Sequence, residues 1–290
     1  MSPKEIVSEV NQATIVNYYE ECDNAYRDAW GLDHNLQLNL GLWKKGTKNL
    51  SQALLNLNQE MAEKAELTAD SKVLDAGCGV GGTAIYFAKH YGCRVVGITL
   101  APHQAEKARV NAAKEGVEEL CTFKVMNFMK TSFDDESFDA VVGIESICYA
   151  EPKLAFIKEA HRLLIKGGKL VVADNLQGKA ELSKKEFKSL YTNTFYGCKV
   201  TSLDTEEDYL KNLKEANFVK YSCEDYTDFI RPSILRLRRI YYLATTYNTI
   251  YRLLKKPFTA TQEANTKMCY HLHSSLKKGL WKYGVIRAFK

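Results

Sequence analysis

Short apolar runs alternate with amphipathic segments through the middle of the chain. The apolar runs predict strands, and segments whose apolar residues recur every three or four positions predict helices. The expected strands are 72–75, 94–98, 121–126, 138–144 and 168–174, and the expected helices are 81–91, 102–115 and 152–164. This alternation is typical of a parallel sheet covered on both faces, with ligands beyond the carboxyl ends of its strands.

Helical periodicity dominates on either side of this α/β core. It is found at 4–28, 50–65, 183–196, 205–216, 232–255 and 261–280, while 218–227 and 283–289 have the pattern of strands. Because no repeat or low-complexity linker separates these segments, we expect one integrated domain. Its parts are an N-terminal helical lid (1–66), a Rossmann-like ligand-binding core (67–178), and a helical cap (179–290) whose two strands complete a mostly parallel seven-stranded sheet.

The composition is that of an ordinary folded protein, with 46% hydrophobic and 26% charged residues among 290. The N-terminus lacks an apolar secretory segment, and no apolar run is long enough to predict a transmembrane helix. The eight cysteines form no Cys-x-x-Cys pair. We therefore expect a cytoplasmic protein with reduced thiols and no zinc site.

The link between the first expected strand and helix is rich in glycine: Asp75-Ala-Gly77-Cys-Gly79-Val-Gly-Gly82. Glycines permit a tight turn and close approach of a ligand to the backbone, next to the N–H groups that begin a helix. The spacing also satisfies the Gly-x-Gly-x-x-Gly of dinucleotide enzymes, which carry an acid after the following strand. Here that strand ends in Ile98-Thr-Leu100, so a nicotinamide-dependent oxidoreductase is disfavoured.

This glycine segment resembles motif I of the class I S-adenosylmethionine (SAM) dependent methyltransferases. Gly97-Ile-Thr-Leu-Ala-Pro-His-Gln104 is similar to a signature of their sterol, tocopherol and terpenoid C-methyltransferase subset. Gly143-Ile-Glu145-Ser and Leu163-Leu-x-x-Gly-Gly168 agree with it. The resemblance implies a doubly wound Rossmann-like fold and SAM as the cofactor.

The resemblance also implies which residues bind SAM. Asp75 and the Gly77–Gly79 backbone would hold its amino-acid end, Thr99 and Gln104 would lie near the ribose, and Asn127 would accept from the adenine amino group. Many relatives have Asp at position 127; a loop cap for Asn127 and a solvated position for Gln104 are the structural alternatives. The expected cofactor residues are Tyr18, Tyr19, Asp75, Gly77, Cys78, Gly79, Thr99, Leu100, Gln104, Asn127, Phe128, Ile144 and Glu145.

Glu145 is the best candidate for a catalytic base. A carboxylate at the end of a strand and next to apolar residues is a candidate for desolvation and a shifted pKa. In C-methylation Glu145 would remove the proton from the carbocation, and in N-methylation it would orient an amine. Its structural alternative is an acid that caps the following segment.

Aromatic side chains are the expected partners of Glu145, because their faces stabilise cationic centres. Tyr18 and Tyr19 resemble a tyrosine pair that covers the SAM pocket in related enzymes, and Tyr18 and Tyr149 are expected to join Glu145 in catalysis. Phe195 and Tyr196 fall where class I enzymes insert a substrate lid, so with Tyr149 they are expected to contact the acceptor. Ordinary core packing is the alternative for each.

The C-terminal fifth of the chain is strongly basic. Residues 229–290 contain 13 Lys or Arg and one acid, whereas the rest has 27 basic and 34 acidic residues. Three interpretations remain open: Arg231 and Arg236 bind a phosphate or diphosphate of the acceptor, a basic amphipathic helix contacts a membrane peripherally, or a solvated face packs on a second subunit. We expect a homo-oligomer. No RNA-recognition signature is present, and His161, His271 and His273 do not suggest a metal site.

Two functional hypotheses follow. The first is C-methylation of an isoprenoid: a prenyl diphosphate, a prenylated aromatic or a sterol-like molecule. The second is N- or O-methylation of a small amine, phosphobase or natural product. A SAM-binding subunit without turnover is a further alternative, and the fold cannot decide among them.

Overall fold

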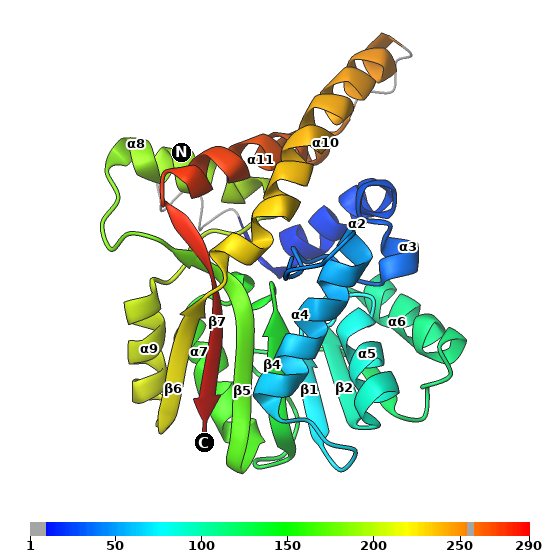
Figure 1. Cartoon of the computed structure of the whole chain (residues 1–290), viewed down its shortest axis with the longest axis vertical. Helices are drawn as coiled ribbons and strands as arrows, with labels where there is room; N and C mark the ends of the chain where they lie inside the picture. Colours follow the sequence, from blue (N-terminus) through cyan, green and yellow to red (C-terminus); the bar gives the residue numbers. More distant parts are fainter. Residues whose placement is uncertain (1–9, 254–257) are drawn as a thin grey trace.

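The computed structural model describes residues 10–253 and 258–290, with side chains for 10–250 and 258–290 (Figure 1). One sheet of seven strands runs through it in the order β3-β2-β1-β4-β5-β7-β6. Only β7 runs against its neighbours, which confirms the predicted mostly parallel sheet. The strands are β1 (Lys72–Ala76), β2 (Arg94–Thr99), β3 (Cys121–Val125), β4 (Phe138–Ile144), β5 (Leu164–Gln177), β6 (Lys220–Asp225) and β7 (Trp281–Phe289).

Successive side chains of each central strand enter different cores, because side chains alternate across a strand. In β1, Val73 belongs to one apolar cluster and Leu74 to the other, and in β4 the same holds for Val142 and Val141. Burial on both faces explains why these strands are continuous apolar runs in the sequence. The helices covering the first face are α4 (Leu50–Ala65), α5 (Gly82–Tyr91) and α6 (Pro102–Lys114), and those covering the second are α7 (Lys153–Leu163) and α9 (Glu206–Glu215).

A helical cap covers the carboxyl ends of the parallel strands (Figure 1). It combines both ends of the chain: α2 (Gln12–Trp30) and α3 (Leu32–Asn35) with α10 (Thr227–Leu253) and α11 (Ala260–Lys277). Capping boxes begin α2 at Asn11 and α11 at Thr259. The helix expected from residue 4 lies partly outside the described residues. No described helix is long and apolar enough to cross a membrane.

The prediction of one helix over 183–196 is wrong. The segment is broken into α8 (Lys184–Phe187), a π-helical turn (Lys188–Thr192) and a 3-10 turn (Phe195–Cys198). The Thr194 hydroxyl donates to the Ser189 carbonyl at 2.7 Å, and such side-chain bonds compete with regular helix geometry.

The helix expected from residue 232 begins earlier, at Thr227, and holds Pro232 in its interior. Proline there removes one backbone hydrogen bond. Ile230, Ser233 and Ile234 are buried around it, so tertiary packing offsets this loss. The strand expected at 168–174 is also longer than predicted, because β5 starts at Leu164 and ends at Gln177.

Candidate active site

The turn between β1 and α5 brings the backbone to the surface of a cavity. Gly77 and Gly79 have φ of +94° and +53°, in the left-handed region that favours glycine. A Cβ on Gly77 would overlap the side chain of Ser146, whereas the space at Gly79 is open. The turn therefore presents unobstructed backbone at the start of α5, as the glycine pattern predicted.

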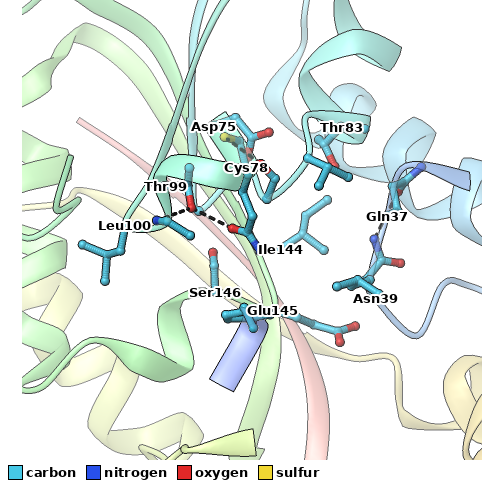
Figure 2. Close-up of a pocket in the computed structure, with 18 of the residues that line it drawn as sticks. Gln37, Asn39, Asp75, Cys78, Thr83, Thr99, Leu100, Ile144, Glu145 and Ser146 are labelled. Atoms are coloured by element: carbon cyan, nitrogen blue, oxygen red, sulfur yellow. Dashed lines mark hydrogen bonds between the residues drawn. The ribbon is translucent and has the colours of Figure 1, made fainter. Parts of the chain in front are cut away.

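Asp75 lies beneath this turn as a buried carboxylate. Its Oδ2 has no hydrogen-bond partner, and burial raises the pKa of its carboxyl to about 7. A buried carboxylate without an ionic partner is costly and favours a cationic one. The ammonium group of SAM fits that requirement. Figure 2 shows Asp75 and Thr99 lining one cavity with Glu145.

Thr99 and Gln104 form a polar pair on the β2 side of this cavity. The Thr99 hydroxyl donates to Oε1 of Gln104 at 2.8 Å and accepts from the Ala101 N–H at 3.2 Å. Both side chains are buried, so Gln104 is not a solvated helix residue. Their position beside the expected ribose site stays a prediction.

The loop after β3 is used differently from expectation. Asn127 is not among the residues that line the cavity, and its Oδ1 accepts from the Met129 N–H at 2.8 Å. It therefore caps its own loop, and its placement does not support the predicted contact with adenine. The neighbouring Phe128 does line the cavity, as do Cys78, Leu100 and Ile144.

The loop between α3 and α4, for which the sequence predicted no functional role, closes the opposite wall. Gln37 and Asn39 are buried, line the cavity, and are joined by a hydrogen bond of 3.1 Å. A Cβ on Gly82 would overlap the Leu36 carbonyl, so this loop presses against the start of α5. The sequence does contain a signal, because polar residues alternate with leucines in Gln37-Leu-Asn39-Leu.

A second cavity, of about 570 Å³, adjoins the first on the side of α10 and α11. Its lining is mostly aliphatic and aromatic, from α2, α10 and α11. Four residues line both cavities and mark their junction: Tyr19, Leu38, Glu145 and Tyr149. We call the two the cofactor cavity and the acceptor cavity.

Glu145 is held firmly at this junction. Its Oε1 accepts from the Leu40 N–H at 2.8 Å and from the Tyr283 hydroxyl at 2.9 Å. Burial, with a smaller contribution from the charge of nearby Asp174, raises the pKa of its carboxyl to about 8 against the opposing effect of these two hydrogen bonds. Its φ of +49° is uncommon for a residue with a side chain, and such strain concentrates at functional sites.

The adjacent tyrosines of α2 face different partners. The Tyr19 hydroxyl donates to the Tyr149 hydroxyl at 3.2 Å, and Tyr149 donates to the Cys198 carbonyl at 2.8 Å. Tyr18 lines only the acceptor cavity, where its hydroxyl bonds with Tyr26 and Asn265. Tyr19 and Tyr149 therefore lie where methyl transfer would occur, whereas Tyr18 is placed away from the cofactor cavity.

The predicted acceptor residues are only partly brought together. Phe195 lines the acceptor cavity and packs edge-on against Trp281. Tyr196 does not line it, and its ring lies under the Lys199 ammonium. The fold places these neighbours on different sides of a 3-10 turn.

Among the α10 arginines whose side chains the structure describes, only Arg236 lines the cavity. Arg236 lines it, stacked on Trp30, with one guanidinium nitrogen buried and unpartnered. Arg231 is exposed and pairs with Asp228, and Arg238 bonds with His273. The predicted grip of Arg231 on the acceptor is therefore not supported by its position.

Comparisons with known proteins agree with this geometry. A family model described as a methyltransferase domain matches residues 74–172. The 27-O-demethylrifamycin SV methyltransferase of Amycolatopsis mediterranei is 30% identical over 68% of this chain and 71% of its own. The chloroplastic tocopherol O-methyltransferase of Arabidopsis thaliana is 27% identical over 95% of this chain and 81% of its own.

Solved structures share the fold at lower identity. The cyclase SpnF superimposes with a TM-score of 0.80 at 21% identity, covering 97% of both chains. A geranyl diphosphate C-methyltransferase of Streptomyces coelicolor, solved with S-adenosyl-L-homocysteine, gives 0.74 at 17% identity over 96% of this chain and 97% of its own. Because the relatives above agree with the glycine turn and with the unpartnered oxygen of Asp75, we conclude that the chain belongs to the SAM-dependent methyltransferases that act on small molecules. SAM is its cofactor.

Proposed function

We propose that this enzyme methylates a carbon atom of a bulky, uncharged isoprenoid, such as a prenylated aromatic or a sterol-like molecule. The observation that carries the proposal is the acceptor cavity: it is largely apolar, large enough for a small-molecule ligand, and meets the cofactor cavity at Glu145. An acceptor filling it would present one end to the methyl group.

The charges of the acceptor cavity favour an uncharged acceptor over a prenyl diphosphate. Arg236 is the one Lys or Arg among its described lining residues, which also include Asp28 and Glu145. A diphosphate carries several negative charges and is bound by several cationic groups. The name of the Arabidopsis relative, tocopherol O-methyltransferase, supports the isoprenoid class.

The residues at the junction suit methyl transfer to carbon. Bound SAM supplies an electrophilic methyl group. The acceptor alkene forms the new carbon–carbon bond as the sulfur–methyl bond breaks, which leaves a carbocation on the acceptor. The faces of Tyr19 and Tyr149 stabilise this cation, and ionised Glu145 takes a proton from the neighbouring carbon to restore a double bond.

O-methylation of a phenol or alcohol is the second candidate. Glu145 would then accept the hydroxyl proton as the oxygen attacks the methyl group. The activity named for the Arabidopsis relative favours this alternative, and the same cavity admits both acceptors.

The test is turnover with methyl-labelled SAM on prenylated phenols, sterols, prenyl diphosphates and small amines, each offered in detergent. We expect labelled products only from the first two classes, with the methyl assigned to carbon by NMR. A methyl on oxygen would establish the second candidate, and turnover restricted to diphosphates or amines would refute the isoprenoid proposal as stated.

A further inference from the structure

Exposed apolar side chains run along α10. Leu235, Tyr242, Leu243 and Ile250 have exposed fractions of 45%, 51%, 72% and 49%. In Figure 1, the later part of α10 extends with the start of α11 away from the body of the molecule. Exposed apolar side chains that lie together often mark an interaction site, whereas apolar side chains exposed singly do not.

This surface is continuous with the acceptor cavity. Leu243 lines the cavity and is also the most exposed of the four, and the adjoining Ala244 lines the cavity too. Leu243 therefore offers an apolar path from the outer face of α10 into the cavity.

The charge around this surface complements an anionic partner. Arg231, Arg239 and Lys267 are exposed on α10 and α11, and the sequences of these two helices hold seven Lys or Arg against the two acids Asp228 and Glu263. Apolar side chains flanked by basic ones suit a bilayer containing anionic lipid. A second copy of the chain would cover Leu243 and close the cavity there, whereas a bilayer would itself hold an apolar acceptor.

We propose that α10 and α11 dock on an anionic lipid bilayer, and that the acceptor enters from the lipid past Leu243. The entry step rests on the proposed function, because it assumes an apolar acceptor. The docking step does not, since it requires only the exposed side chains and the charge.

The experiment is co-sedimentation of the full chain with vesicles of phosphatidylcholine, with and without phosphatidylserine. The test variant is Tyr242→Glu with Ile250→Glu; neither residue lines a cavity. The matched control is Val110→Glu with Val219→Glu, two residues that are 45% and 69% exposed and lie outside α10 and α11, on α6 and just before β6. Binding of S-adenosylhomocysteine reports whether each variant is folded.

We expect wild type and control to bind vesicles containing phosphatidylserine, and the test variant to bind at least about tenfold more weakly while retaining S-adenosylhomocysteine. Wild type that binds no vesicle, or a folded test variant that binds like wild type, refutes docking. If light scattering shows that wild type is a dimer and the test variant a monomer, and wild type binds no vesicle, the apolar face of α10 belongs to a contact between two copies of the chain. That result also refutes docking on a bilayer. Vesicle binding without turnover of any isoprenoid leaves docking standing and refutes only the proposed function.

Discussion

The Tyr283 hydroxyl, on the antiparallel strand β7, donates a hydrogen bond of 2.9 Å to Oε1 of Glu145 at the end of β4. This bond favours the ionised carboxylate and opposes the effect of burial on its pKa. The last strand of the chain therefore adjusts the protonation of the proposed base, although it lies outside the region matched by the methyltransferase family model.

Replacing Tyr283 by Phe removes this hydrogen bond without emptying the space. We expect the pKa of Glu145 to rise by about one to two units, because hydrogen bonds to charged groups contribute about 1.5–3 kcal/mol. The acidic limb of the kcat/KM profile, along which activity rises as the base ionises, should move to higher pH by the same amount. The control is Tyr209→Phe, since the Tyr209 hydroxyl is buried without a partner. Equal profiles for the two variants would show that Tyr283 does not act on Glu145.

Glu145→Gln should abolish most turnover and spare S-adenosylhomocysteine binding. Normal turnover in this variant would eliminate Glu145 as the base. Because Gln is nearly isosteric and keeps an oxygen to accept from Leu40 and Tyr283, a folding defect is not expected from the substitution.

The same variant should change how stability depends on pH. The pKa of Glu145 is about 8 in the fold, above its ordinary value of 4.5. Its protonation therefore stabilises the native state fully below about pH 4.5, and this contribution is lost as the pH rises through 8. Melting temperatures of ligand-free protein from pH 5 to 9 should fall more steeply for wild type than for Glu145→Gln. Parallel curves would contradict the raised pKa.

Asp75→Asn should separate ligand binding from stability. The variant loses the negative charge that would pair with the ammonium group shared by SAM and S-adenosylhomocysteine. The affinity for S-adenosylhomocysteine, measured by calorimetry, should therefore fall at least about tenfold. Ligand-free protein should become more stable at pH 8, because an unpaired buried carboxylate is removed. Unchanged affinity would refute the assignment of Asp75 to the cofactor.

Ala244→Trp should fill part of the acceptor cavity, where Ala244 is a lining residue. We expect KM for a bulky acceptor in detergent to rise about tenfold or more, with S-adenosylhomocysteine binding unchanged. Thr249→Trp, on the same helix but exposed and outside the lining, is the control. If both variants turn over the acceptor like wild type, this cavity does not bind it.

The sequence by itself determined the sheet and the cofactor turn, because both depend on residues that are close together in the chain. Strands buried on two faces require continuous apolar runs, and β2 and β4 begin where those runs were expected, at Arg94 and Phe138. The conformation of Gly77 depends on its missing side chain, so its residue type alone predicts the turn.

Tertiary structure alone decided which side chains meet around the acceptor. Glu145 is bonded to Leu40 and Tyr283, residues 105 and 138 positions away in the chain, and no local pattern encodes such a pair. Tyr18 and Tyr19 are neighbours in sequence, but successive residues on a helix point about 100° apart. Tyr18 therefore bonds with Asn265, whereas Tyr19 bonds with Tyr149. For the same reason, Arg231 and Arg236 leave α10 in different directions, and only packing against α2 selects Arg236 for the cavity.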